Sequence, residues 1–409
     1  MSNFLHGVTV TEVNDGVRPI QTSSSSVIGI IGTAPEAQNF PLNTPTLITG
    51  SYTEAAKLGK TGTLPSAVNA ILAQTGAVIV VVRVAEATKD ESQTVPDHDS
   101  EDEGATKTIT VQVLDAESTK TNIIGKVEKD GSYLGTYSFL ASKSKLGVSP
   151  RILLAPGFST KDVVAELIKI AERLRAVVIA DTPTDSDENL MQFVTDCASA
   201  RVYAVYPQVI NTKNEIEPTS PYVAGVIAKN DNDNGFWCSP SNKTINGIVG
   251  LSKPVDFSLG DSACRANYLN EKNIATIINQ DGYRLWGNRS TVNDGQYKFL
   301  CVRRTADIIS DSILQAHLWA VDRNIVKNYL TDVVESVNAF LSDLRAQGAI
   351  LAGKCYANKE LNTAANIANG QVYFDFEFTP AYPAEQVTFR AYLNNENIEE
   401  VLLQNLAEA

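Results

Sequence analysis

The residues best suited to chemistry or binding in this 409-residue chain lie between positions 277 and 307. An alternating pattern places several polar and aromatic side chains on one strand face, and paired arginines then open a helical pattern. The set is Arg284, Trp286, Asn288, Arg289, Arg303 and Arg304. Guanidinium groups are buried only with partners, because an unpaired buried charge is costly. The set therefore predicts either a paired structural junction, the commoner role of such networks, or a binding face.

Residue types for hydrolytic or nucleotide chemistry are scarce. A nucleophilic triad needs a serine, a histidine and an acid that can meet, and the only histidines are His6, His98 and His317. His317 lies in an apolar helical pattern, which favours a hydrogen-bonded core or interface residue over a base. The chain has no G-x-S-x-G elbow, dinucleotide loop or P-loop. We therefore predict no catalytic and no cofactor-binding residues; the alternative is an α/β hydrolase or nucleotide-dependent enzyme.

Metal sites are not predicted either. Residues 86–104 carry eight carboxylates around His98, but their spacing matches no calcium loop, so an acidic surface loop is expected. The 5 cysteines are odd in number and scattered, which is typical of reduced thiols in a cytoplasmic protein.

Composition limits the partners. A net charge of −13 without a basic cluster argues against direct nucleic-acid binding. No apolar run is long enough for membrane insertion, and the start of the chain lacks the pattern of a secretory signal. The length suggests two or three domains.

The elements that would position these residues follow an α/β order. Buried strands are expected at residues 27–33 and 77–84. From residue 151 to residue 206, short apolar strands alternate with amphipathic helices, which predicts parallel strands covered by helices. Two further amphipathic helices are expected at 305–321 and 326–345.

Both ends of the chain alternate like strands. Val8, Val10 and Val13 precede a serine-rich connector at 22–26, and Val387 and Phe389 follow two prolines. Leu402 lies in a last apolar tail. Such a strand needs a partner for its backbone groups. Each end could fold back on its own sheet or add a strand to a neighbouring copy.

Several blocks in order carry a family resemblance. Residues 281–289 read DGYRLWGNR, residues 303–307 read RRTAD, and residues 316–322 read AHLWAVD. Together with shorter matches from residue 6 to residue 157, they resemble the contractile tail sheath proteins of myophages and R-type pyocins. The resemblance covers nearly the whole chain and is weakest between residues 86 and 122.

The resemblance implies an α/β and α+β fold: a subtilisin-like α/β sheath core without protease chemistry, an inner C-terminal α+β domain and extended terminal strand arms. It implies the following division of the chain. The N-terminal arm and linker is 1–26, the inner domain combines 27–85 with 270–385, the outer α/β region is 86–269 with its acidic loop at 86–104, and the C-terminal arm is 386–409.

The function implied by the resemblance is that of a structural subunit. Copies would polymerise as stacked hexameric rings around a tail tube protein, meet baseplate and tail-terminator proteins, and contract to drive the tube through the target cell envelope. The particle would be a virion or a bacteriocin-like device, assembled in the host bacterial cytoplasm. Arg323, Lys327 and Arg345 are the basic candidates for tube contact, although carboxylates share their helix.

Overall fold

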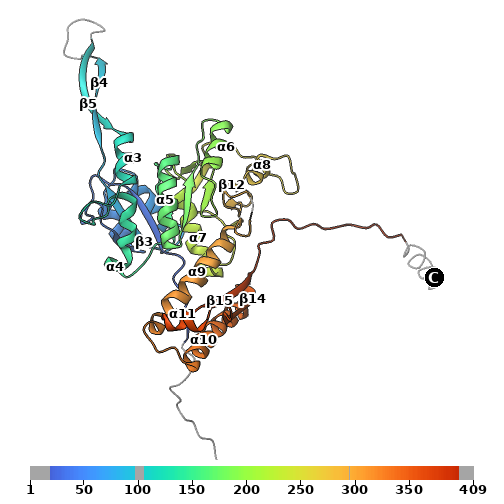
Figure 1. The fold of residues 1–409 in the computed structure, drawn as a ribbon. Coiled ribbons are helices and arrows are strands. Elements are labelled where there is room, and N and C mark those ends of the chain that lie inside the picture. Colours follow the sequence, from blue (N-terminus) through green and yellow to red (C-terminus); the bar gives the residue numbers. More distant parts are fainter. Residues whose placement is uncertain (1–18, 97–105, 294, 396–409) are drawn as a thin grey trace, which may run out of the picture.

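A large mixed sheet forms the centre of the computed structural model, which describes residues 19–96, 106–293 and 295–395 (Figure 1). The sheet has 8 strands, and its two edge strands, β13 and β2, are antiparallel to their neighbours. The strands between them run parallel. In spatial order they are β13 (Tyr283–Trp286), β12 (Ile274–Asn279), β8 (Val202–Val205), β7 (Val177–Asp181), β6 (Ile152–Leu154), β1 (Ile28–Thr33), β3 (Val78–Val84) and β2 (Thr46–Thr49).

Helices cover both faces of this sheet, so the predicted layered α/β unit is confirmed. The helices α2 (Leu64–Leu72) and α7 (Ser220–Asn234) pack in the core cluster on one face. On the other face, α3 (Ala116–Ile124), α5 (Lys161–Leu174) and α6 (Asp187–Asp196) contribute to a second cluster. Burial on both faces explains why the central strands are runs of Val, Ile and Leu rather than alternating patterns.

The sheet crosses the implied boundaries between inner and outer ranges. β1 belongs to the range 27–85, but it pairs with β6 from the range 86–269 as well as with β3. β12 lies beyond residue 270 and pairs with β8. The two ranges therefore share one hydrogen-bonded sheet.

The C-terminal part forms a smaller α+β unit that α9 (Leu300–Ala316) connects to the sheet (Figure 1). Its helix α10 (Lys327–Ala346) packs on the hairpin of β14 (Ile350–Ala357) and β15 (Phe374–Pro380). A third cluster of buried residues, including Ile309 and Phe340, fills this unit. It also contains η3 (Leu318–Ala320) and α11 (Ala364–Ala368). The two amphipathic helices expected here are confirmed, with α9 beginning five residues earlier than predicted.

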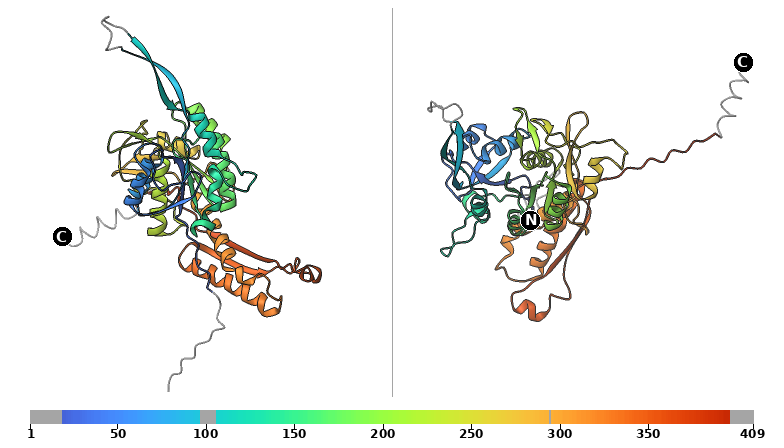
Figure 2. Two further views of the ribbon diagram at one scale, coloured as in Figure 1. Left: turned by 90° about the vertical axis from the view of Figure 1, so that its left-hand side faces the viewer. Right: turned by 90° about the horizontal axis from the view of Figure 1, so that it is seen from above.

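A long hairpin of β4 (Thr88–Pro96) and β5 (Thr106–Leu114) projects from the sheet body (Figures 1 and 2). The surface loop predicted at 86–104 was therefore wrong for residues 88–96, which form a strand, whereas residues 97–105 lie outside the described residues. An alternating pattern is absent because residues 88–92 are exposed on both faces: Lys89 and Glu91, which pair with Val113 and Val111, point to one face and Asp90 to the other.

The remaining elements are short. They are α1 (Tyr52–Ala55), η1 (Ala56–Leu58), η2 (Gly135–Ala141), α4 (Ser142–Leu146), β9 (Val209–Asn211), β10 (Ile216–Glu217), β11 (Ile248–Leu251) and α8 (Arg265–Glu271). None of the described helices combines the length and the apolar character that crossing a bilayer demands.

One end of the described chain packs on the body, and the other extends away from it. Residues 19–26 run along α9, where the Ser23 N–H donates to Ser312 Oγ at 2.9 Å. Residues 381–395 leave the body as an extended chain (Figures 1 and 2). The strand pattern around Val387 and Phe389 forms no strand within this chain, and these side chains are 67% and 91% exposed. Val8, Val10, Val13 and Leu402 lie outside the described residues.

Candidate assembly interface

The predicted Arg/Trp set does not form one junction. The structure divides it among the helix α9, the strand β13 and the segment that follows β13. Arg303 and Arg304 belong to a buried ionic network on α9. Arg284 and Trp286 lie on β13, and Arg289 contacts the C-terminal chain. The prediction of a single cluster was wrong because alternation on one strand face shows that side chains point the same way, not that they share partners.

Asp307 is the centre of the α9 network. It is buried, and Arg201 donates to its two carboxylate oxygens at 2.7 and 3.0 Å. Arg303, one helical turn before Asp307, donates to the same oxygens at 2.8 and 3.2 Å. Two guanidinium groups thus satisfy one buried carboxylate, which is the arrangement that a buried charge requires.

Asp311, one turn further along α9, receives a second group of arginines. Arg151 pairs with Asp311 and also donates to a main-chain carbonyl of α5, and Arg175 Nη1 lies 4.0 Å from Asp311. Burial lowers the pKa of Arg151, and the carboxylates of Asp311 and Asp307 oppose this shift. Asp307 and Asp311 share one face because residues four apart are neighbours on a helix.

The three arginines from the sheet share a position. Arg151 and Arg201 directly precede β6 and β8, and Arg175 lies two residues before β7. Since neighbouring parallel strands begin at the same edge of a sheet, their leading residues meet one helix there. Reasoning from the sequence missed these arginines, although a recurring Arg before consecutive strands was a usable signal.

Arg304 points to the other side of α9 and is almost fully buried. It forms a two-point pair with Asp231 near the end of α7, and its Nη2 donates to the carbonyl of Ser25 at 3.0 Å. Burial alone would lower the pKa of Arg304, but the attraction of Asp231 prevails and raises it. This residue therefore ties the N-terminal linker, α7 and α9 together.

Arg284 and Trp286 have local roles on the half-buried edge of the sheet. Arg284 donates to the carbonyls of Gln280 at 2.9 Å and Asn242 at 3.2 Å. Trp286 packs edge-on against Phe257, with ring centroids 4.9 Å apart. Asn288 is buried, and its carbonyl accepts from the N–H of Leu300 at 3.0 Å, which fixes the start of α9.

Arg289 makes one of two contacts between the body and the C-terminal chain. Its Nε donates to Glu385 Oε1 at 2.7 Å and its Nη2 to Glu385 Oε2 at 2.5 Å. Phe299, which pairs with Arg289 in an isolated antiparallel bridge, meets Tyr382 edge-on with ring centroids 6.2 Å apart. Residues 382–385 are therefore held at two points.

The carboxyl ends of the parallel strands, where an α/β enzyme would bind its ligand, hold a helix cap. Asp181, at the end of β7, accepts from the N–H of Ser220 at 2.7 Å and from its Oγ at 2.5 Å, at the first residue of α7. Burial raises the pKa of Asp181 to about 6, against the lowering effect of the bonds from Ser220.

No histidine in the described part of the chain reaches this cap. His317, the one described histidine, lies at the end of α9 in the C-terminal unit, with Nδ1 2.7 Å from the carbonyl of Ile313 and Nε2 3.1 Å from Ser336 Oγ. The prediction that His317 is a hydrogen-bonded structural residue is confirmed. Residues 19–96, 106–293 and 295–395 also contain no cluster of three potential metal ligands.

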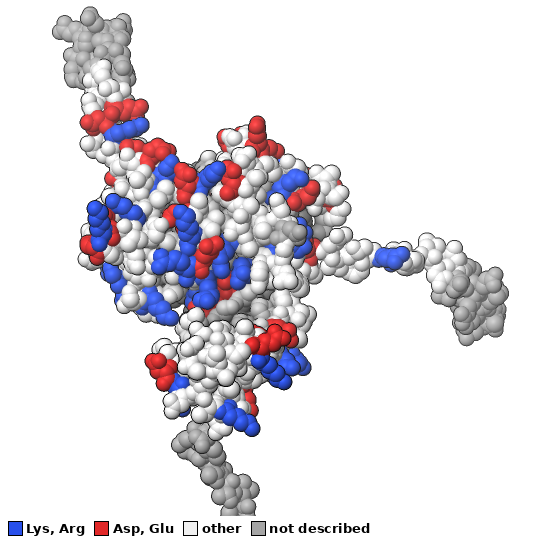
Figure 3. Space-filling model, viewed as in Figure 1, with Lys and Arg blue, Asp and Glu red and all other residues white. Residues whose placement is uncertain are grey.

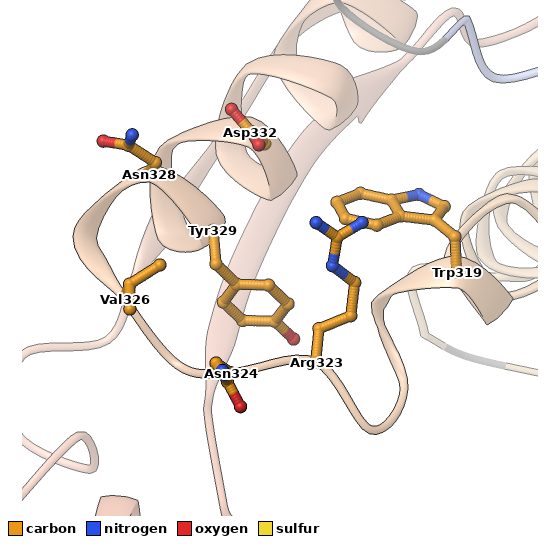
Figure 4. A pocket seen from close by; sticks show the side chains of 7 residues that line it. All are labelled: Trp319, Arg323, Asn324, Val326, Asn328, Tyr329 and Asp332. Atoms are coloured by element: carbon orange, nitrogen blue, oxygen red, sulfur yellow. The ribbon is translucent and has the colours of Figure 1, made fainter.

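The three candidates for tube contact are exposed but do not lie together. Arg323 lines a hollow of about 310 Å³ before α10, with its guanidinium 5.5 Å from the Trp319 ring and Tyr329 beside them (Figure 4). Lys327 begins α10, whereas Arg345 lies in its last turn, about 27 Å away along the helix axis at 1.5 Å per residue. Only Arg323 and Lys327 share one end of the unit.

Charges on the face shown in Figure 3 are mixed rather than segregated. Lysines and arginines alternate with acidic side chains over the sheet body, and the C-terminal unit carries both signs at its rim. This face offers no broad basic surface of the kind that binds nucleic-acid phosphates.

Three family models of phage tail sheath domains match successive parts of the chain. Residues 25–84 match the tail sheath protein Gp18 domain III N-terminal region, residues 133–291 the phage tail sheath protein central domain, and residues 292–394 the phage tail sheath C-terminal domain. The chain is 40% identical to a prophage major tail sheath protein of Pseudomonas aeruginosa (strain UCBPP-PA14), covering 98% of this chain and 99% of the relative. It is 33% identical to the tail sheath protein of Escherichia phage P2, covering 97% of each.

A solved structure shares the fold. The helical sheath of the anti-feeding prophage in its contracted state superimposes with a TM-score of 0.69 at 18% identity, covering 96% of this chain and 100% of that one. The matched domains follow one another from residue 25 to residue 394, and the prophage relative is matched over almost its full length. This chain therefore belongs to the phage tail sheath protein family.

Proposed function

We propose that this chain is a structural subunit of a contractile tail sheath. Its copies polymerise as stacked hexameric rings around a tail tube, and contraction drives the tube through the target cell envelope. The observation that carries the proposal is the segment 386–395, which extends away from its own body with apolar side chains in water (Figure 2). A chain that exposes Phe389 and Leu393 at 91% and 88% is incomplete as a monomer.

The arm is proposed to complete a sheet of a neighbouring copy. An extended segment with unpaired backbone groups gains main-chain hydrogen bonds when it joins an open sheet edge. Residues 387–393 alternate between apolar and polar types, which suits a strand with one buried face. In the N-terminal arm, Val8 and Val10 alternate with Thr9 and Thr11, and this arm, including Val13, is assigned the same role.

The hairpin β14–β15 is the proposed acceptor, and the outer side of β14 is capped at Cys355. On β14, the Asn338 side chain accepts from the N–H of Cys355 at 2.7 Å and donates to its carbonyl at 3.0 Å. Because both main-chain groups of Cys355 bond the Asn338 side chain, they do not bond β15. They therefore point to the outer side of β14. The amide of Asn338 therefore occupies this edge like a paired residue.

The outer side of β15 has no such cap among the described residues. Phe376 lies opposite Cys355 in the register, so its N–H and carbonyl also face outward, and alternation gives Phe374 and Phe378 the same direction. Phe374 and Phe378 pack partly on the core of the unit, which holds this strand in place. A strand from another copy would thus pair with β15.

The finer assignments belong to the same proposal, and family membership and this geometry support them. We place the unit from α9 to β15 on the inside, with Arg323 and Lys327 toward the tube protein, and the hairpin β4–β5 on the outside. We assign residues 27–85 and 270–385 to the inner domain and residues 86–269 to the outer region. The two parts share the central sheet. The core is assigned to the subtilisin-like α/β type, since parallel strands lie between two helical layers.

The proposed setting is a virion tail sheath or a bacteriocin-like particle assembled in the bacterial cytoplasm. Baseplate and tail-terminator proteins are the proposed partners at the ends of the sheath, and a solved relative comes from the baseplate of the anti-feeding prophage. The energy for contraction would be stored in the packing of copies, so the chain itself would need no cofactor.

Hydrogen exchange during assembly tests the arm and its acceptor together. The main-chain amides of Phe374, Phe376 and Phe378 are expected to exchange quickly in monomers and to gain at least about tenfold protection in assembled tubes. The amides of Gly353 and Ala357 on β14 serve as the matched control. Tubes in which the β15 amides gain no protection, or unchanged tube formation after deletion of 386–409, would count against the exchange of arms.

A further inference from the structure

We propose that Arg289 and Phe299 are positioning residues that fix the direction in which the C-terminal arm leaves the body. They hold the arm at its root, residues 382–385, and so determine where its strand can meet a neighbouring copy. This inference rests on the proposed function, because it assigns the root of the arm that links the copies.

The two contacts at the root come from one piece of backbone. Arg289 and Phe299 face each other in an antiparallel bridge, and main-chain bonds flank it: the N–H of Ser290 donates to the Lys298 carbonyl at 2.7 Å. Phe299 is buried and immediately precedes α9. The bridge is therefore a fixed part of the body, and it presents one cation and one aromatic ring to the arm.

The arm meets both groups within four residues. Tyr382 lies edge-on to Phe299, and Glu385 takes both hydrogen bonds from Arg289. A bidentate guanidinium–carboxylate pair fixes orientation as well as distance, because both groups are planar. Together with the Tyr382 contact, it defines the direction of the chain at residue 385.

The contacts between the arm and the body that define its direction lie at this root. The exposed fraction of Val387 is already 67%, and the Arg390 guanidinium lies over the Tyr392 ring, two residues along the arm. The direction in which an extended segment leaves a body is set where the body holds it. Loss of that contact lets the arm sample many directions, which lowers its effective concentration at the acceptor strand.

The pair is suited to positioning rather than to stabilising the fold. Arg289 and Glu385 are 32% and 35% exposed, and exposed ion pairs contribute little to the free energy of unfolding. Charge reversal should therefore leave the monomer folded while it changes assembly. A purely structural pair would show the opposite result.

Charge reversal and charge exchange test the inference in the full chain. The single variants Arg289→Glu and Glu385→Arg are expected to raise the protein concentration needed for half-maximal tube formation by about 3- to 10-fold, because the arm loses its direction. The exchanged double variant R289E/E385R is expected to return within about twofold of the wild type. Sedimentation and electron microscopy measure assembly, and thermal unfolding checks the monomers.

Deletion of residues 386–409 separates this inference from the proposed function. Abolished assembly in the deletion variant, but wild-type assembly in both single variants, would overturn the positioning role and leave the arm function intact. Wild-type assembly of the deletion variant would overturn both. Failure of the exchanged pair to recover would also overturn the role, and the milder Glu385→Gln variant, expected to raise the concentration about 2- to 3-fold, covers the case in which charge reversal prevents folding.

Discussion

Arginine–carboxylate contacts fix both the helix α9 and the root of the C-terminal arm, but in opposite environments. On α9, the side chains of Arg304 and Asp231 are 4% and 1% exposed, and Asp307 receives two arginines. At the arm root, a single pair is about one-third exposed on each side. The first contact cannot open without stranding a charge, whereas water can replace the second.

The buried ion pairs on α9 therefore cost much more free energy to break than the exposed pair at the root of the arm. The α9 network joins the sheet, the N-terminal linker and the C-terminal unit, so these parts should remain together during any rearrangement of copies. The root of the arm can release at small cost. Burial, more than the residue types, determines which behaviour a given ion pair has.

The largest effect is expected at Arg304. The Arg304→Ala variant leaves Asp231 buried without its partner, and the free energy of unfolding should fall by about 3–5 kcal/mol. Chemical denaturation monitored by circular dichroism measures this change. Arg303→Ala is the matched control on the neighbouring residue, and its loss should be smaller because Asp307 keeps Arg201. Equal losses in the two variants would contradict the contrast.

Asp181 offers a third case beside the two kinds of ion pair. It is a buried carboxylate that accepts hydrogen bonds from Ser220 and has no cation as its partner in these bonds. Its folded-state pKa of about 6 lies above the unfolded value of 3.8, so the folded state binds the proton more tightly. Stability from this group is therefore full below about pH 4 and falls as the pH rises through 6. The difference is at most about 3 kcal/mol. Denaturation from pH 4 to pH 7 should show this fall in the wild type and not in Asp181→Asn.

The smallest effect on stability is expected at Arg289. The Arg289→Ala variant should change the free energy of unfolding of the monomer by less than about 1 kcal/mol. Raising the salt concentration to 1 M should remove most of that difference, because exposed charges are then screened within about 3 Å. Denaturation at low and high salt measures both. If the free energy of unfolding fell as much as in Arg304→Ala, the exposed pair at the arm root would be as important for stability as the buried pair on α9.

The sequence predicted the elements better than the contacts between them. Strands such as β3 and the amphipathic helices α5 and α10 were visible because their apolar periodicity reflects direct burial. The hairpin strand β4 was missed because its residues 88–92 are exposed on both faces. β14 was also not predicted, since polar and small residues interrupt its apolar ones.

The site was only partly predictable, because a sequence shows which residues need partners and not which partners they find. Arg303 and Arg304 were singled out as residues that need partners, and the structure pairs both with carboxylates. Their partners Asp307 and Asp231 lie four and 73 positions away, and the second distance follows no local pattern. Arg289 was likewise identified, but Glu385 lies 96 positions away, beyond the reach of any local pattern.

The capped edge of β14 has a consequence for how many foreign strands one hairpin can accept. With the amide of Asn338 bonded to Cys355 on one side, the proposed place for a visiting strand is beside β15. Two arms from different copies would then have to form successive layers, the second on the first. Attachment would be ordered, and removal of the first arm would release both.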